Sequence, residues 1–378
     1  MNFEVYNKNE NNLKVAFFSK RTFGGIFAEK LNMEKISKYS NIEIHLFDSE
    51  NKNLFEFKSV KDHDNIESDR EVLDNYKLIL KYIKENKIKV CIFFVSGFPW
   101  SEKFLNELKK YSYAACYFGD DPEACEKTSK YYVKNFNYSF CGGVYFNKKI
   151  KISEQYLKWG ARKSKFIPLG ASPVKYKEPF NSLDSRNIDL VYVGSCYFPK
   201  VFRMFKLKSY FGNRMKIYGR GWNESGSFVK TIVLKIIKFL YNVPIIEELP
   251  KNKLVELYQN TKIGFNTHMS YGPSNLRIYE LPINGVMQIC DCENGLKNLY
   301  EIGKEVIAYK NIKDAIKKIE YYLAHDGERI AIAKAGYERA KKYYKTEISF
   351  EKIIDEIRKD IDNNYKQIYL LTETKRNE

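Results

Sequence analysis

The sequence has few residues of the kinds that build metal or redox sites. Four histidines and seven cysteines occur among 378 residues, and no two cysteines form a CxxC pair. Zinc ribbons and thioredoxin-type sites use such pairs, so neither is indicated. Cys290 and Cys292 alternate around Asp291, but two thiols without histidine partners are a weak metal signal. We expect free, reduced cysteines and no bound metal.

Long apolar runs are also missing. No stretch reaches the roughly 20 apolar residues that span a bilayer, and the polar start, MNFEVYNKNENN, lacks a signal-peptide core. We expect a cytoplasmic protein. One segment, residues 228–241 (FVKTIVLKIIKFLY), leaves open a peripheral contact at the inner membrane face. The favoured alternative is a core helix whose lysines extend to solvent.

Basic residues outnumber acidic residues by a wide margin. Sixty-four Lys and Arg against 47 Asp and Glu give a net charge of +17, which attracts nucleic acid, acidic lipid or nucleotide phosphates. The excess is mostly lysine, whereas nucleic-acid binders concentrate arginine at their contacts. We therefore do not expect nucleic acid as a partner, although DNA as an acceptor stays an alternative.

Strands alternate with helices along most of the chain, which predicts α/β architecture with parallel sheets. In the first half we expect strands at 13–19, 42–48, 89–95 and 113–118, and helices that include 71–86, 102–110 and 123–136. The pattern breaks at 171–187, read as a linker, and restarts with a strand at 189–194. We assign an N-terminal domain to 1–172, a second domain to 186–348, and a last helix and tail to 349–378.

Candidate binding residues follow the predicted strands, because ligands of open α/β sheets bind beyond the carboxyl ends of strands. HExxH, Walker A, nucleophile-elbow and GxGxxG motifs are absent. The loops that qualify include Gly24 and Gly25, Gly194, and Gly219 with Arg220. Glycines let a backbone approach a ligand, and Arg220 offers a cation. The alternative for Gly219 and Arg220 is a tight turn with a solvated arginine.

The segment 271–285, YGPSNLRIYELPING, is the strongest candidate for an anion site. Ser274, Asn275 and Leu276 lead into a predicted helix, whose free N–H groups and dipole favour a diphosphate. Arg277 in the first turn could bind phosphate, and Glu280 one turn later could accept hydrogen bonds from ribose hydroxyls. The alternative is an exposed i,i+3 pair of Arg277 and Glu280.

Three residues could serve in catalysis. Asp120 and Asp121 follow a buried strand and could act as a general base or hold a sugar hydroxyl. The alternative is that they cap the next helix. His268 follows the predicted strand KIGFNT just before the anion segment, although a lone histidine is more often structural.

The second half resembles the CgeB-like, spore-coat-type group of bacterial glycosyltransferases with the GT-B fold. The matching pieces are DLVYVGSCY, KIYGRGW, LVELYQNTKIGFNTH, LRIYELPINGVMQICD and the segment from LYEIGKEVIAYK to GYERA. The first half matches more loosely, through YFGDDPE and YLKWGARKSKFIPLGASP. The order and spacing of these pieces match as well as their letters.

The resemblance implies two Rossmann-like domains with parallel sheets facing a cleft, and a C-terminal helix that crosses back onto the first domain. It implies a hexosyl- or related transferase that takes a UDP-, GDP- or dTDP-sugar as donor and needs no other cofactor and no metal. It places Glu280 where relatives hold ribose. Many retaining relatives carry another glutamate eight positions earlier, where this chain has Gly272. The resemblance therefore leaves open whether the transferred sugar keeps or inverts its anomeric configuration.

The expected function is therefore transfer of a sugar to a protein, glycan or small-molecule acceptor. The alternatives are a non-catalytic GT-B protein of surface assembly, or a transferase whose acceptor is DNA or a lipid-linked sugar.

Overall fold

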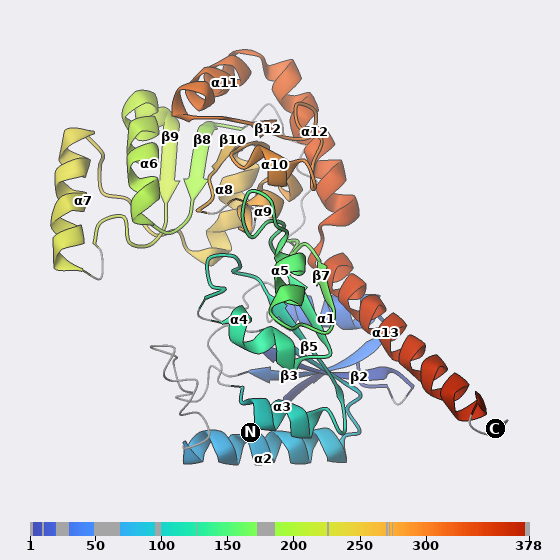
Figure 1. Ribbon diagram of the computed structural model, residues 1–378. Coiled ribbons are helices and arrows are strands. Elements are labelled where there is room, and N and C mark those ends of the chain that lie inside the picture. Colours follow the sequence, from blue (N-terminus) through green and yellow to red (C-terminus); the bar gives the residue numbers. More distant parts are fainter. Residues whose placement is uncertain are drawn as a thin grey trace. The chain divides into compact units, whose positions relative to one another are not determined.

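The computed structural model describes residues 3–9, 11–19, 30–48, 69–94, 100–126, 128–171, 186–224, 227–269, 271, 273 and 275–374. The chain forms two compact units (Figure 1). The N-terminal unit comprises Met1–Leu169 together with Thr346–Glu378, and the C-terminal unit comprises Gly170–Lys345.

The N-terminal unit is built on a seven-stranded sheet in the order β1-β3-β2-β4-β5-β6-β7. Its strands are β1 (Phe3–Tyr6), β2 (Leu13–Ser19), β3 (Ile42–Asp48), β4 (Val90–Phe94), β5 (Tyr113–Phe118), β6 (Tyr138–Cys141) and β7 (Ser164–Phe166). All pairs are parallel except β1 with β3. The prediction missed the edge strand β1, because its surroundings are polar.

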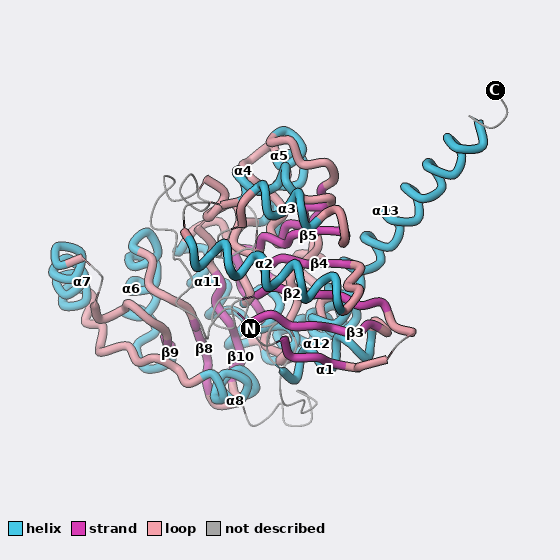
Figure 2. The backbone as a smooth tube through the Cα atoms, turned by 90° about the horizontal axis from the view of Figure 1, so that it is seen from below, coloured by secondary structure: helices cyan, strands magenta, loops and turns pink. Residues whose placement is uncertain are grey.

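Alternating side chains of β2 pack on opposite faces of this sheet. Phe18 stacks on Phe93 at 4.5 Å and meets Trp100 at 5.3 Å, on the face covered by α2 (Arg70–Glu85) and α3 (Glu102–Leu108) (Figure 2). Phe17 lies 5.6 Å from Phe350 of the C-terminal helix α13 (Thr346–Thr374). Helix α1 (Lys30–Tyr39) packs beside α13. Strands buried on both faces explain the continuous apolar runs.

One predicted helix, 123–136, is wrong as a continuous element. A turn precedes α4 (Ser129–Tyr132) and a short 3-10 helix (Val133–Asn135). Thr128 has φ −134° and ψ −78°, which is outside the helical region and interrupts the helix. The remaining helix of this unit is α5 (Ile152–Lys158).

Helix α13 belongs to the N-terminal unit although it ends the chain, as expected for a helix that crosses back. Asp360 anchors it: the carboxylate is 2% exposed, accepts a hydrogen bond from the Tyr113 hydroxyl at 2.5 Å and is bonded by Lys163. One turn earlier, Glu356 accepts from the Tyr138 hydroxyl at 3.2 Å.

The C-terminal unit has a five-stranded parallel sheet in the order β12-β11-β10-β8-β9. Its strands are β8 (Ile188–Val193), β9 (Met215–Tyr218), β10 (Thr261–Asn266), β11 (Met287–Cys290) and β12 (Ile307–Ala308). From β8 the chain moves first to β9 on one side and then to β10 on the other. The strand order therefore reverses between β8 and β10, which is where doubly wound sheets bind ligands.

Helices cover both faces of this sheet. Leu190 and Tyr192 of β8 pack in a cluster with α6 (Phe198–Phe211), α11 (Ile312–Ala324) and α12 (Asp326–Tyr343), whereas Val191 packs with α8 (Leu254–Gln259) and α9 (Arg277–Ile283). The other helices are α7 (Phe228–Leu240) and α10 (Glu293–Leu296). Both units are Rossmann-like, which confirms the predicted fold class. No helix in the described ranges is both long and apolar enough to cross a membrane.

Candidate functional site

Arg277 joins the carboxyl ends of β8 and β10, at the point where the strand order reverses. It is the first residue of α9 and is 8% exposed. Its Nη1 donates to the carbonyl oxygen of Val193 at 2.5 Å, its Nε to Oδ1 of Asn266 at 3.1 Å, and its Nη2 to the carbonyl oxygen of Thr267 at 3.4 Å. The guanidinium also lies over the Tyr192 ring, 4.4 Å from its centre. These contacts fix the cation at the sheet edge.

The contacts of Arg277 leave part of its hydrogen-bonding capacity open. A guanidinium has five N–H donors, and the three bonds to Val193, Asn266 and Thr267 use one each. All three acceptors are neutral, and no carboxylate in the described part of the chain lies within ion-pair distance of Arg277. The exposed Arg277–Glu280 pair is therefore the wrong alternative. A buried cation with spare donors is suited to an anion.

Two glycines allow this close packing. Gly194 directly follows β8, and a Cβ there would stand 2.0 Å from Nη1 of Arg277. Gly219, after β9, has φ +142°, and a Cβ there would stand 2.2 Å from the carbonyl oxygen of Gly194. That same oxygen accepts a hydrogen bond from Nε1 of buried Trp222 at 2.8 Å. The structure thus brings Gly194, Gly219 and Arg277 together.

Glu280 lies one turn into α9 and is half-buried. Burial raises the pKa of its carboxyl group to about 7, against the opposing effect of the Arg277 cation. The backbone of Glu280 is held by Asn284, whose Nδ2 donates to its carbonyl oxygen at 2.8 Å. The hydroxyl of Tyr258, from α8, is buried and has no hydrogen-bond partner in the described residues.

His268 is held by Asp291 through three hydrogen bonds. The His268 backbone N donates to Oδ1 and Oδ2 of Asp291, each at 3.0 Å, and Nδ1 lies 2.7 Å from Oδ1. Thr267 adds a bond to Oδ2 at 2.8 Å. Burial would raise the pKa of Asp291, but hydrogen bonds from His268 and Thr267 hold it below its usual range. The imidazole is positioned, and its Nε2 is buried with no partner in the described residues.

A buried amide network connects the end of β10 to the start of α9. Nδ2 of Asn275 donates to Oδ1 of Asn266 at 2.8 Å, and Nδ2 of Asn266 donates to Gln288 at 2.9 Å. Oδ1 of Asn275 is buried and unpaired within the described part of the chain. Leu276, next to it, accepts the backbone N–H of Glu280 at 3.0 Å. The sequence prediction missed Asn266 and Thr267, although two polar residues ending an apolar strand were a usable signal.

Other predicted residues lie apart from this cluster or outside the description. The Arg220 side chain is 81% exposed and pairs with Glu248 at 3.1 Å, as in the tight-turn alternative. Gly24, Gly25 and Ser274, and also Gly272, lie outside the described residues.

Asp120 and Asp121 belong to the N-terminal unit and have different surroundings. Asp120 is exposed, whereas Asp121 is 1% exposed and accepts a hydrogen bond from the Tyr156 hydroxyl at 2.5 Å. Burial raises the pKa of Asp121 to about 6. The Asp121 carboxyl therefore ties α5 to the turn after β5, and of the two only Asp120 offers its side chain to solvent.

One group of potential metal ligands occurs among the described residues. His268, Asp291 and Cys292 offer ligand atoms within 4.8 Å of one another. However, Asp291 already accepts from His268 and Thr267, and Nη1 of Arg203 lies 3.6 Å from its Oδ2. A cation at that distance supplies the positive charge a metal would bring, so we assign Asp291 to positioning His268.

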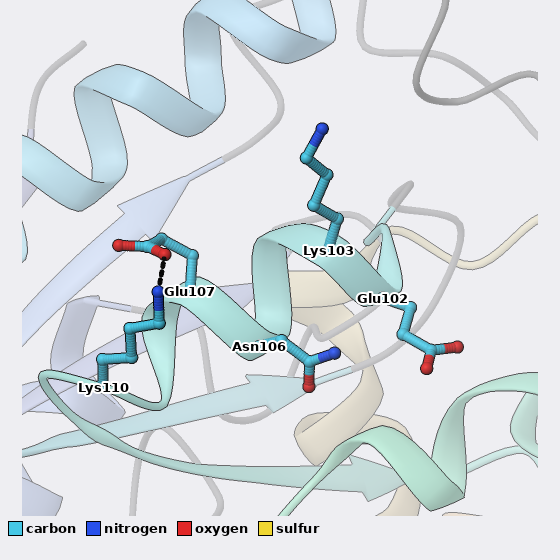
Figure 3. Close-up of a pocket in the computed structure, with 5 residues that line it drawn as sticks. All are labelled: Glu102, Lys103, Asn106, Glu107 and Lys110. Atoms are coloured by element: carbon cyan, nitrogen blue, oxygen red, sulfur yellow. Dashed lines mark hydrogen bonds and ion pairs between the residues drawn. The ribbon is translucent and has the colours of Figure 1, made fainter.

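A surface depression on the N-terminal unit is unrelated to these residues. It is lined by Glu102, Lys103, Asn106, Glu107 and Lys110, all from α3 and the residues just after it (Figure 3). Lys110 and Glu107 form an ion pair at 2.6 Å. This is a solvated helix face, and no predicted site residue lines it.

Comparison with known proteins gives one family match and several structures with a similar fold. Residues 202–355 match the model of a family described as glycosyl transferase-like. A glycosyltransferase from Rickettsia africae has a similar structure, with a TM-score of 0.61 and 12% identity over 93% of this chain and 100% of that one. The fold is that of GT-B glycosyltransferases.

Two further structures share the fold over nearly the whole chain. Sucrose-phosphate synthase from Thermosynechococcus elongatus has a TM-score of 0.63 and 11% identity over 93% of this chain and 99% of that one. HepE from Anabaena, solved with UDP and glucose, has a TM-score of 0.57 and 11% identity over 92% of this chain and 100% of that one. No curated protein sequence matches the chain.

Proposed function

We propose that this chain is a glycosyltransferase that moves a hexosyl or related sugar from a nucleoside-diphosphate sugar to a protein, glycan or small-molecule acceptor. The observation that carries the proposal is Arg277, a buried cation with spare donors at the strand-order reversal, with Glu280 one turn along α9. The match of residues 202–355 to glycosyl transferase-like proteins supports the same reaction.

In this proposal the donor diphosphate binds at Arg277. Its open N–H groups donate to phosphate oxygens, and Gly194 and Gly219 let the arginine and the two strand ends pack closely enough to hold the cation at the sheet edge. Glu280 accepts hydrogen bonds from the two ribose hydroxyls. UDP is the first nucleotide to test, because HepE was solved with UDP-glucose, and GDP- and dTDP-sugars are the next.

Transfer breaks the bond between the sugar and the diphosphate, so negative charge develops on the leaving phosphate. A fixed cation at that position stabilises the transition state without reorganising, which lets the site work without a metal. His268, oriented by Asp291, offers Nε2 as a further polar contact to the donor. We assign deprotonation of the acceptor hydroxyl to Asp120, since Asp121 is occupied by Tyr156.

The sequence motifs support a finer placement, in the CgeB-like group of bacterial cytoplasmic enzymes. The pieces KIYGRGW and LRIYELPINGVMQICD contribute Gly219, Arg277 and Glu280, so the quoted motifs and the proposed donor site coincide.

Thermal melting with nucleotide sugars tests the proposal. A donor at 100 times its Kd stabilises the folded chain by about 2.7 kcal/mol. We expect one of the UDP-, GDP- or dTDP-sugars to do so, and Glu280→Ala to abolish most of the shift. Glu256→Ala is the matched control, because Glu256 is an exposed glutamate of α8 paired with Lys253. A full shift in Glu280→Ala would refute the site, and no shift with any donor would refute the function.

A further inference from the structure

Helix α7 has an outward face made of apolar side chains. Of its 13 residues only Leu234 and Ile237 are buried. Apolar side chains elsewhere on the helix are exposed: Phe228 81%, Val229 67%, Ile232 42%, Ile236 54%, Phe239 86% and Leu240 71%. The expectation of a core helix is therefore wrong, because most of its apolar surface meets solvent.

These exposed residues fall on one side of the helix. At 100° per residue, positions 228, 239, 232, 236, 229 and 240 occupy a continuous arc of about 120°. Leu234 and Ile237 lie on the opposite side, which packs on the unit's core. The apolar arc is thus a single stripe facing away from the unit. In both views α7 lies outside α6, at the β9 end of the sheet (Figures 1 and 2).

The charges around the stripe have one sign. The chain has no Asp or Glu from residue 225 to residue 246, but it has Lys230, Lys235 and Lys238. Lys230 and Lys235 are exposed, and Lys235 borders the stripe on the helical wheel. Lys238 instead donates to Oδ1 of Asn223 at 2.7 Å. Beyond the helix, Ile245 is another apolar side chain, 80% exposed.

We propose that α7 docks the protein on the surface of an anionic lipid bilayer, lying parallel to it with the apolar stripe among the acyl chains. Thirteen residues make a helix of about 20 Å, shorter than the hydrocarbon core of about 30 Å. The helix therefore lies in the interface. Lys235, at the edge of the stripe, then reaches the anionic headgroups.

Charge complementarity favours lipid over a protein partner. Protein interfaces are depleted in lysine, whereas an apolar stripe with a lysine at its edge, on a helix without acidic residues, is the composition of interfacial helices. The net charge of +17 adds long-range attraction to the same surface. This proposal rests on α7 alone and does not depend on the glycosyltransferase assignment.

Vesicle flotation of the full-length chain tests the proposal. We would compare phosphatidylcholine vesicles with vesicles that also contain phosphatidylglycerol. The double variant Phe228→Ser/Phe239→Ser removes the two most exposed rings of the stripe. The matched control is Leu78→Ser/Leu157→Ser, which changes two exposed leucines (47% and 50%) on α2 and α5. Lys235→Glu reverses the charge beside the stripe.

We expect the wild type and the leucine control to float with the anionic vesicles. Burying a phenylalanine is worth a factor of about ten or more in partitioning, so the double Phe variant should bind at least about a hundredfold more weakly. Charge reversal should weaken binding to anionic vesicles by about tenfold. All of these substitutions are at exposed positions, and thermal melting verifies folding.

Three results would overturn the proposal. The first is a wild-type chain that floats with neither vesicle. The second is a Phe variant that floats as well as the leucine control. The third is a wild-type dimer in light scattering that becomes a monomer in the Phe variant, which would assign the stripe to a second copy of the chain.

Discussion

The Arg277 guanidinium fills the space in front of Gly194, so that a Cβ on this glycine would stand 2.0 Å from Nη1. Alanine at position 194 must therefore displace the arginine or the strand end. We expect Gly194→Ala to lower the free energy of unfolding by about 1–3 kcal/mol and to weaken donor binding. Denaturant titration and calorimetry measure the two effects. Gly327→Ala is the control, since nothing lies within 4 Å of its added Cβ, and equal behaviour of both variants would contradict the prediction.

Lysine cannot replace Arg277. A compact ammonium cannot donate at once to Val193, Asn266 and Thr267 and still meet a phosphate. We expect Arg277→Lys to fold but to bind a nucleotide sugar at least about tenfold more weakly, the loss of about one charge-assisted hydrogen bond. Calorimetry with the responding donor measures it. Arg220→Lys, at an exposed position, should bind nearly as the wild type does, and equal losses in both variants would move the phosphate site away from Arg277.

Glu280 should make stability depend on pH. Its pKa is raised to about 7 because burial penalises the carboxylate, so folding favours the protonated form. The resulting stabilisation is full below the unfolded pKa and is lost as pH rises through about 7. Glu280→Gln cannot ionise at this position. We expect its unfolding free energy, relative to the wild type, to increase between about pH 5 and about pH 8. A constant difference across this range would show that Glu280 does not titrate there.

Features that depend on short stretches of sequence could be predicted. Apolar runs separated by helical segments predicted both sheets, and the start of α9 marked Arg277 and Glu280 as a pair. It could not predict that Arg277 is buried, because its acceptors Val193, Asn266 and Thr267 come from two strands far apart in the chain.

Two other features were not predictable from the sequence: the contact between Asp291 and His268, and the exposure of helix α7. Asp291 holds His268 from the end of a neighbouring strand, and neither residue's own surroundings indicate the other. Helix α7 is apolar nearly all round, a composition that fits a buried helix and an exposed lipid-binding one equally. In the structure α7 packs on α6, at the margin of the unit, so its apolar stripe is exposed to solvent. The sequence does not indicate this position.

Asp291 should affect sugar transfer through His268, the residue that it orients. An asparagine there would direct an NH2 group at donors that now bond to a carboxylate, and so would release the imidazole of His268. We expect Asp291→Asn to slow transfer by about 10- to 100-fold, the cost of losing one charge-assisted hydrogen bond. His268→Gln should cost about as much, and the double variant little more, because the two residues act as one unit. Additive losses in steady-state rates would contradict this coupling.

Asp360 should stabilise the N-terminal unit through its contacts with Tyr113 and Lys163. Burial would raise its pKa, but these hydrogen bonds hold it below the usual value, so its contribution is present above the unfolded pKa and lost as pH falls. We expect Asp360→Asn to lower the free energy of unfolding at neutral pH by about 1.5–3 kcal/mol, and the difference to shrink below about pH 4.

Tryptophan fluorescence during denaturation checks this expectation, since Trp100 and Trp159 report on the N-terminal unit and Trp222 on the other. The matched control is Asp362→Asn, an exposed aspartate two residues further along α13, which should unfold as the wild type does. If both variants unfold alike, α13 is held by its apolar contacts, such as Phe350 against Phe17, and the buried carboxylate adds nothing measurable.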